Sequence, residues 1–173
     1  MPILPGLGNS IKRKIFVSYH HDLDQFYYND FSNTFATNYE SISDNSLERE
    51  VDSDDPEYVM RRIRETYISG TYCTVVLCGS ETFLRKYVDW EIKATLDKEH
   101  SLIGIILPGC IENCFPNRLV DNINSGYALL INWKDVIQNR NHLSQCIEIA
   151  NQRSRMNINN GRQMQKINGS LFP

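Results

Sequence analysis

Apolar runs bounded by turn residues recur along the chain and predict the strands of a buried sheet. The longest run lies within Thr71–Ser80, is rich in β-branched residues and ends at Gly79. Four further strands are predicted at Arg13–Tyr19, Tyr39–Ser43, Leu102–Leu107 and Ala128–Trp133. Runs that are apolar at almost every position suit the middle strands of a parallel sheet, because both faces of such a sheet are covered. The polar run at 39–43 suits a place near an edge.

Helical spacing of apolar residues predicts helices between these strands. The first helix is predicted at about Asp24–Thr37, with Asp22 or Asp24 as its cap. Its aromatic residues recur on one face, and we interpret this stripe as core rather than as a ligand platform. The stripe consists of Phe26, Tyr27, Phe31 and Phe35.

Cap residues set the ends of the other predicted helices. Pro56 suits the first position of a helix that ends at Gly70, and the acidic residues before Pro56 would cap it. Ser80 is a good N-cap for a helix that ends near Glu99. A last helix is predicted at Asn141–Arg153, and the residues 108–126, rich in Pro, Asn and Gly, predict a long loop.

The alternation of strands and helices predicts an α/β fold of three layers. We expect a flavodoxin-like or doubly wound arrangement, with helices on both faces of a mostly parallel sheet of about five strands. Ligands of such sheets bind at the carboxyl edge, where the strands end. We divide the chain into a leader at 1–11, one domain at 12–153, and a tail at 154–173 that is disordered or loosely docked.

Composition and net charge restrict the classes of binding partner to be expected. The 173 residues carry a net charge of −3 and are 41% hydrophobic, which is ordinary for a globular protein and favours neither nucleic acid nor a membrane surface as partner. The N-terminus lacks the basic and apolar regions of a signal peptide, and no apolar run is long enough to span a bilayer. We therefore expect a cytoplasmic protein.

Neither the spacing of the cysteines nor the known catalytic and nucleotide-binding motifs identify a reaction for this chain. The sequence has five cysteines and no Cys-x-x-Cys pair, which favours buried free thiols in a reducing compartment over a zinc site. No dinucleotide-binding glycine motif, Walker A motif, zinc-protease motif or nucleophile elbow occurs. We interpret His20-His21 as a surface turn, and Arg61, Arg62 and Arg64 as a solvated or partner-facing surface.

Glu91 is the candidate functional acid of the helix after Ser80. That helix has a predicted buried stripe of Leu84, Val88, Ile92, Thr95 and Leu96. Glu91 falls at the flank of the stripe, where a carboxylate is partly removed from water and can point into a cleft. Spacing alone leaves a structural salt bridge and a catalytic carboxylate both open, and slightly favours the salt bridge.

Three segments, Lys14–His20, Cys78–Phe83 and Arg85–Ile92, share a pattern with one known family. The family pattern is a first strand ending in Ser-Phe/Tyr-His, a strand ending in Gly-Ser-x-Thr-Phe/Tyr, and then Arg/Lys-aromatic-Val-x-x-Glu-Ile. With these segments the chain resembles the TIR-like proteins of bacterial Thoeris anti-phage systems over roughly residues 13–107.

The resemblance implies a flavodoxin-like fold and an enzyme that consumes NAD⁺ as its substrate, with no bound cofactor or metal. The product would be an ADP-ribose-derived nucleotide, often cyclic, that activates a separate effector protein after a phage trigger, and we expect self-association. The resemblance assigns catalysis to Glu91. The residues expected around the nucleotide are Ser18, Tyr19, His20, Asp44, Ser80 and Trp90.

The chemistry of NAD⁺ cleavage suits a single carboxylate. Breaking the nicotinamide–ribose bond builds positive charge on the ribose, and nicotinamide leaves as a neutral molecule, so no strong general acid is needed. On this hypothesis Glu91 faces the ribose, while Tyr19 and Trp90 shape the site and exclude water.

Two interpretations from other classes remain. The first is a non-enzymatic signalling or scaffold domain that associates through the loop at 108–126 and the arginine-rich helix. The second is a flavin-binding flavodoxin-like protein, although His20-His21-Asp22 stands where its phosphate loop would lie.

Overall fold

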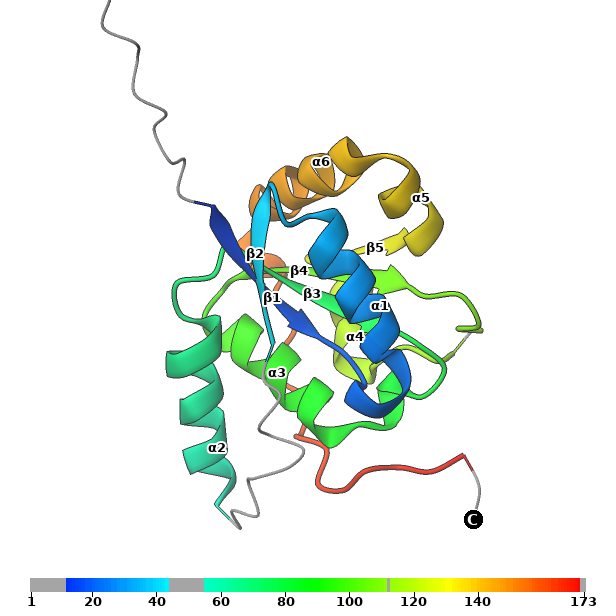
Figure 1. The fold of residues 1–173 in the computed structure, drawn as a ribbon. Coiled ribbons are helices and arrows are strands. Elements are labelled where there is room, and N and C mark those ends of the chain that lie inside the picture. The colour runs from blue at the N-terminus through cyan, green and yellow to red at the C-terminus, as the bar shows by residue number, and fades with distance from the viewer. Residues whose placement is uncertain (1–11, 44–54, 112, 172–173) are drawn as a thin grey trace, which may run out of the picture.

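One parallel sheet of five strands forms the centre of the molecule (Figure 1). The computed structural model describes residues 12–43, 55–111 and 113–171. The strand order is β2-β1-β3-β4-β5, and every neighbouring pair is parallel. The strands are β1 (Arg13–Ser18), β2 (Tyr39–Ile42), β3 (Cys73–Cys78), β4 (Ser101–Ile106) and β5 (Leu129–Asn132). The predicted α/β class and parallel sheet are confirmed.

The polarity of β3 and of β2 matches their places in the sheet. β3 is central and buried at every position, whereas the more polar β2 lies at an edge, as its sequence predicts. Side chains of a strand alternate between faces, so Cys73 and Cys78, five residues apart, fall in hydrophobic clusters on opposite faces.

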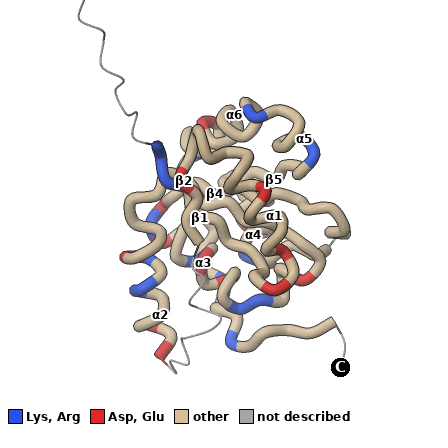
Figure 2. Tube along the Cα trace, viewed as in Figure 1, with Lys and Arg blue, Asp and Glu red and all other residues tan. Residues whose placement is uncertain are grey.

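Helices cover both faces of the sheet (Figure 1). One face packs against α1 (His21–Thr34), α5 (Trp133–Gln138) and α6 (Arg140–Asn151). The other face packs against α2 (Pro56–Arg62), its π-helical continuation η1 (Ile63–Ile68), α3 (Lys86–Asp97) and α4 (Asn117–Asn124). Charged positions of both signs are dispersed over the fold in the view of Figure 2 rather than gathered into one basic face.

The helix formed by α2 and η1 follows its sequence signals. Asp55 accepts a hydrogen bond from the backbone of Glu57, Pro56 opens the helix, and Gly70 after its end adopts a φ of +83°. Arg64 is not simply solvated, because its Nη1 lies 3.2 Å from Asp97 Oδ2 and ties η1 to α3.

The start of α1 and its aromatic stripe differ from the prediction. The helix begins at His21, and its N-cap His20 makes no side-chain cap, so neither Asp22 nor Asp24 has the expected capping role. Phe26 is 72% exposed, whereas Phe31 and Phe35 are fully buried. The reason is helical geometry: five residues at 100° each turn Phe26 about 140° away from Phe31.

The helix predicted to start at Ser80 is interrupted. The chain passes through a short 3₁₀-helix, η2 (Thr82–Leu84), and α3 begins only at Lys86, so Ser80 is not an N-cap. Thr82 explains the interruption, because its hydroxyl accepts from the Gly79 amide at 2.8 Å and lies 3.2 Å from the Leu77 carbonyl. These contacts fold the chain back onto the end of β3.

The C-terminal third of the chain differs from the predicted arrangement of elements. The region 108–126 contains α4, and α5 follows β5 directly; neither helix was predicted. Residues 159–168 run along α4 and α3 and are held there by hydrogen bonds. Within the described residues, no helix is both long and apolar enough to cross a bilayer.

Candidate functional site

The structure brings together two site residues that lie far apart in the sequence, Ser18 and Glu91. Ser18 ends β1 and, by strand alternation, faces the same side as Phe16, toward α3. Its hydroxyl donates a hydrogen bond to Glu91 Oε2. Both side chains are buried, and Glu91 is only 3% exposed. A carboxylate is thereby fixed beside the end of a central strand, at the edge where open α/β sheets bind ligands.

Helix α3 is anchored to the sheet one turn after Glu91. The Thr95 hydroxyl lies 2.8 Å from both the Glu91 carbonyl and the Thr74 hydroxyl of β3. On the flank of α3, Trp90 packs in one hydrophobic cluster with Phe16 of β1. These contacts fix the rotation of α3, and therefore the direction of the carboxylate.

Tyr19 lies on the opposite side of β1 from Ser18. Its hydroxyl donates to Gln25 Oε1 at 2.9 Å, and its ring stacks on Tyr28 at 4.6 Å. Burial raises the pKa of Tyr19 to about 12, opposed by a hydrogen bond with Ser43 and reinforced by nearby Tyr28 and Glu91. The phenol is therefore neutral at physiological pH and belongs to the packing under α1.

His20 is buried rather than part of a surface turn. Its side chain is 4% exposed, and its carbonyl accepts from the Asp24 amide at 2.8 Å in the first turn of α1. His21 is partly exposed, and its ring lies 4.2 Å from that of Tyr19. The surface-turn interpretation is therefore wrong for His20.

The remaining predicted site residues are not gathered around the carboxylate. Ser80 is exposed in the turn after β3. Trp90 adjoins Glu91 in sequence, but its Nε1 donates to the Gln165 carbonyl at 2.7 Å, toward the tail. Asp44 lies outside the described residues.

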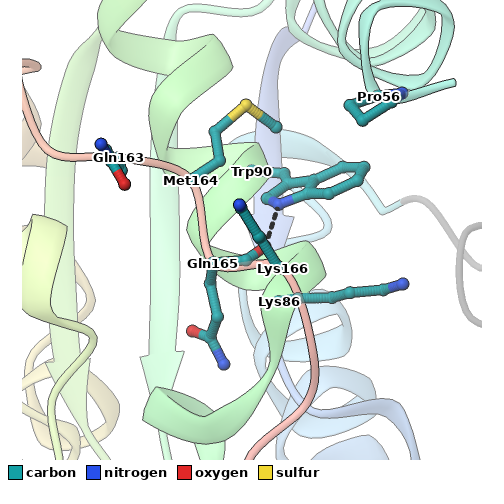
Figure 3. Close-up of a pocket in the computed structure, with 7 residues that line it drawn as sticks. All are labelled: Pro56, Lys86, Trp90, Gln163, Met164, Gln165 and Lys166. Atoms are coloured by element: carbon teal, nitrogen blue, oxygen red, sulfur yellow. Dashed lines mark hydrogen bonds between the residues drawn. The ribbon is translucent and has the colours of Figure 1, made fainter.

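Trp90 lines a groove of about 610 Å³ between α3, the start of α2 and the tail (Figure 3). The indole lies between Pro56 and Lys86 in this view. The Lys86 ammonium is 5.7 Å from the centre of the indole ring, and Lys166 adds a second positive charge to the wall. The lining is completed by Gln163, Met164 and Gln165.

Asp24 is a buried acid near the end of β3. The sequence suggested only a helix-capping role for it. Asp24 is 6% exposed, and Thr82 Oγ1 donates to its Oδ2 at 3.3 Å. A side chain at Gly79 would place its Cβ 2.3 Å from Asp24 Oδ2, so any larger residue there would displace the Asp24 carboxylate. Burial raises the pKa of Asp24 to about 6; the Thr82 hydrogen bond opposes the rise and Glu81 adds to it.

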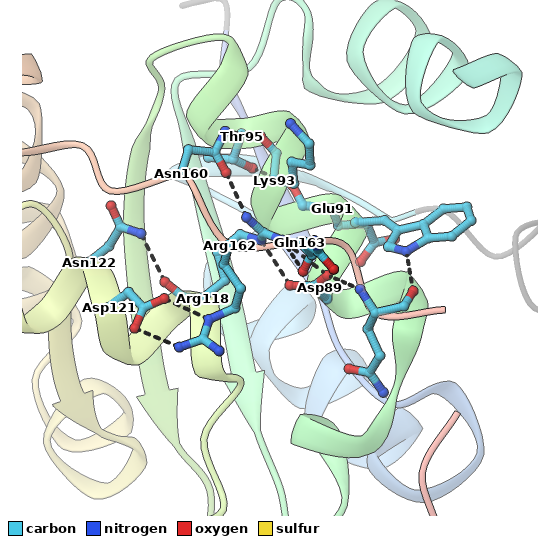
Figure 4. Close-up of polar contacts among 12 residues, drawn as sticks. Asp89, Glu91, Lys93, Thr95, Arg118, Asp121, Asn122, Asn160, Arg162 and Gln163 are labelled. Carbon is cyan, nitrogen blue, oxygen red and sulfur yellow. Dashed lines mark hydrogen bonds and ion pairs between the residues drawn. The ribbon is translucent and has the colours of Figure 1, made fainter. Parts of the chain in front are cut away.

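A second buried acid, Asp89, forms an ion pair that the sequence did not reveal (Figure 4). Arg118 of α4 is completely buried, and its Nε lies 2.8 Å from Asp89 Oδ1. The two opposite charges compensate each other in a buried position, where either charge alone would be costly. The corresponding sequence signal was one basic residue, Arg118, in the region 108–126, which is not enough to locate its partner.

No metal centre is evident in the part of the chain that the structure describes, where no three His, Cys, Asp or Glu side chains are placed to hold an ion. The five cysteines are free thiols.

Comparison with known proteins identifies the family. The family model of the Thoeris protein ThsB, TIR-like domain, matches residues 16–110. No curated protein matches the sequence. Among solved structures, the chain is similar to the TIR domains in the activated Roq1 resistosome directly recognizing the pathogen effector XopQ, at 12% identity and a TM-score of 0.40, over 82% of this chain and 86% of that chain. Because the family match spans more than half of the sequence and includes both Ser18 and Glu91, the chain belongs to the family of Thoeris ThsB TIR-like domains.

Proposed function

We propose that this protein cleaves NAD⁺ at the nicotinamide–ribose bond and converts the ADP-ribose portion into a signalling nucleotide, in cyclic form, that activates a separate anti-phage effector. The observation that supports this proposal is the Glu91 carboxylate, buried at the carboxyl edge of the sheet and fixed by the Ser18 hydroxyl. Membership of a defence family adds the biological context.

The reaction needs little beyond a positioned negative charge. The bond between ribose C1′ and the pyridinium nitrogen breaks, its electron pair passes to nicotinamide, and C1′ takes on oxocarbenium character. Glu91 would face this positive charge and hold the ribose hydroxyls. The hydrogen bond from Ser18 fixes one carboxylate oxygen in advance, so little reorganisation is required as charge develops.

Ring closure requires a nucleophile from the adenosine end of the same molecule. A hydroxyl or ring nitrogen attacks C1′, and the products are nicotinamide, the cyclic nucleotide and, overall, one proton. Water must be excluded, since it would otherwise give linear ADP-ribose.

The burial of Glu91 has a consequence for regulation. A residue that is 3% exposed cannot contact a ribose until the groups that cover its carboxylate move aside. We therefore expect slow turnover by the isolated protein, and acceleration by an infection trigger such as a phage protein or by self-association.

The test is release of nicotinamide from NAD⁺ by purified protein, with and without lysate from phage-infected cells. Glu91→Gln keeps the shape of the side chain and removes its charge, and it should lower the rate by at least about 100-fold. The matched control is Glu99→Gln, which removes an exposed charge just beyond the end of α3 and should leave the rate unchanged.

Mass spectrometry of the product distinguishes cyclic from linear ADP-ribose. A folded Glu91→Gln protein with the wild-type rate would refute the catalytic assignment. If wild-type protein cleaves no NAD⁺ even with infected lysate, the non-enzymatic scaffold interpretation replaces the proposal.

A further inference from the structure

The segment 159–169, which we call the strap, is fixed first on α4 (Figure 4). The Asn159 amide donates to Asn122 Oδ1 at 2.9 Å, and Asn122 Nδ2 donates back to the Asn159 carbonyl at 2.8 Å. Arg162 pairs with both carboxylate oxygens of Asp121 at 2.7 and 2.9 Å. On the helix side, all of these contacts are made by the side chains of Asn122 and Asp121, so they fix the register of the strap along α4.

Buried Arg118 then links the strap to α3. Its Nη1 donates to Asn160 Oδ1 at 2.9 Å and its Nη2 to the Gln163 carbonyl at 3.2 Å, while its Nε holds Asp89. A guanidinium whose donors are shared between α3 and the strap couples the positions of the two segments.

Gln165 is hydrogen-bonded to the two residues that precede Glu91, and Figure 3 shows its contact with Trp90. Its amide donates to Asp89 Oδ2 at 2.8 Å, and its carbonyl accepts from Trp90 Nε1 at 2.7 Å. Its side-chain Nε2 donates to the Leu84 carbonyl at 2.8 Å. One strap residue is therefore bound to α3 and to the turn before it through three separate atoms.

The strap also supplies the cap that the first turn of α3 lacks. Arg85, the N-cap of α3, makes no side-chain cap, but the Lys86 amide donates to Asn168 Oδ1 at 2.9 Å. The Gly169 amide donates to the Leu84 carbonyl at 2.8 Å. Backbone groups left open where η2 meets α3 are thus satisfied from the far end of the chain.

Glu91 lies between these outer contacts and the sheet. On the inner side, Ser18 holds its carboxylate and Thr95 bonds to Thr74. On the outer side, the strap holds the preceding turn. The strap therefore prevents the first two turns of α3 from rotating or lifting away from β1.

We propose that Gln165 is a positioning residue that holds Glu91 against Ser18 through Asp89 and Trp90. The expected effect on kcat rests on the function proposed above, whereas the proposed positioning of Glu91 does not. A displacement of about 1 Å at a reacting group can cost about 100-fold in rate. Loss of the Gln165 contacts should therefore lower kcat with little change in KM.

The experiment compares proline substitutions at two strap positions in the full chain. Gln165→Pro removes the amide that donates to Asp89, and should lower kcat for nicotinamide release by about 10- to 100-fold. Gln163→Pro is the matched control, because the Gln163 amide donates to no acceptor within the described residues and its carbonyl still accepts from Arg118. Gln165→Ala keeps both main-chain contacts and should retain kcat within about fivefold.

Amide hydrogen exchange of each variant provides a readout that does not depend on turnover. Gln165→Pro should speed exchange over residues 86–91 while leaving 92–97 protected, and Gln163→Pro should change neither. A kcat that is unchanged in Gln165→Pro, or lowered equally in Gln163→Pro, overturns the inference.

Failure of the proposed function gives a different pattern. If wild-type protein does not cleave NAD⁺, amide exchange alone decides the inference, and unchanged protection at 86–91 in Gln165→Pro overturns it.

A second variant covers the case in which Gln165→Pro does not fold. Trp90→Phe removes the indole donor to the Gln165 carbonyl. If folded Trp90→Phe then keeps the wild-type kcat, the inference is overturned. If the wild-type protein is inactive, wild-type amide exchange in Trp90→Phe overturns it instead.

Discussion

Asp24 should give this protein a stability that falls as pH rises. Its carboxyl group is buried between the first turn of α1, the Gly79 backbone and the Thr82 hydroxyl. Neighbouring charge comes from Glu81. The thiols of Cys78 and Cys110 also lie close, but burial raises both of their pKa values, to about 11 for Cys110, so they stay neutral.

The magnitude follows from the shift of the Asp24 pKa. Burial raises it from 3.8 to about 6 in the folded protein. Between these values the unfolded chain releases the proton while the folded protein keeps it, so the folded state binds more protons and the free energy of unfolding decreases as pH rises. One pKa unit corresponds to about 1.4 kcal/mol, which gives a cost of about 3 kcal/mol well above pH 6.

This prediction can be tested with Asp24→Asn, whose side chain cannot ionise. Urea unfolding of the variant and of the wild-type protein is measured at a series of pH values. The difference in unfolding free energy between Asp24→Asn and wild type should move by about 2 kcal/mol in favour of the variant from about pH 4 to about pH 7.5. Other titrating groups largely cancel in this difference.

A difference that stays constant with pH would refute this reasoning, because it would mean that Asp24 ionises equally easily in both states. The matched control is Asp22→Asn, which removes an exposed charge from the same turn without touching Gly79 or Thr82. Its difference from wild type should stay within about 0.5 kcal/mol throughout.

Two further predictions concern the core and the buried ion pair. Arg118→Met should cost about 3–5 kcal/mol in urea unfolding, because it leaves the Asp89 carboxylate buried without its cation; a cost below about 1 kcal/mol would contradict the pairing. Phe31→Ala should cost about 3–5 kcal/mol, whereas Phe26→Ser should change stability by no more than about 0.5 kcal/mol. Equal costs at the two phenylalanines would mean that α1 packs through a different face.

The fold was predictable because its strands carry strong local signals. A buried parallel strand is apolar at nearly every position, so β3 and β4 were located to within a residue or two. The helix boundaries were less predictable. Ser80 has the side chain of an N-cap, but the Thr82 hydroxyl bonds to the end of β3 instead and delays the helix to Lys86.

Helix α4, which was not predicted, is short and lies among turn-forming residues. Two of its buried residues, Arg118 and Asn122, are polar, and they face the strap rather than an apolar core. Leu119 and Ile123 do have helical spacing and pack in one apolar cluster, but the helix has only eight residues and lies in a region rich in Pro, Asn and Gly, whose composition predicts a loop.

The candidate site was only half predictable. The resemblance assigned both Glu91 and Ser18 to the nucleotide site, and the structure brings the two side chains into contact. The burial of Glu91 was not expected. A carboxylate at the flank of an isolated helix is partly exposed, but α3 is covered by the sheet on one side and by the strap on the other.

The amino-acid sequence was enough to establish the class of fold and the positions of its five strands along the chain, while the family resemblance singled out Glu91 as the catalytic acid. The fold signals depend on residue spacing within one element, where backbone geometry dictates which side chains share a face. The pairing of polar groups emerges in three dimensions: Ser18 meets Glu91, and Gln165 meets the turn before Glu91. Such pairings join residues about seventy positions apart, and their energies depend on mutual burial, which no local pattern records.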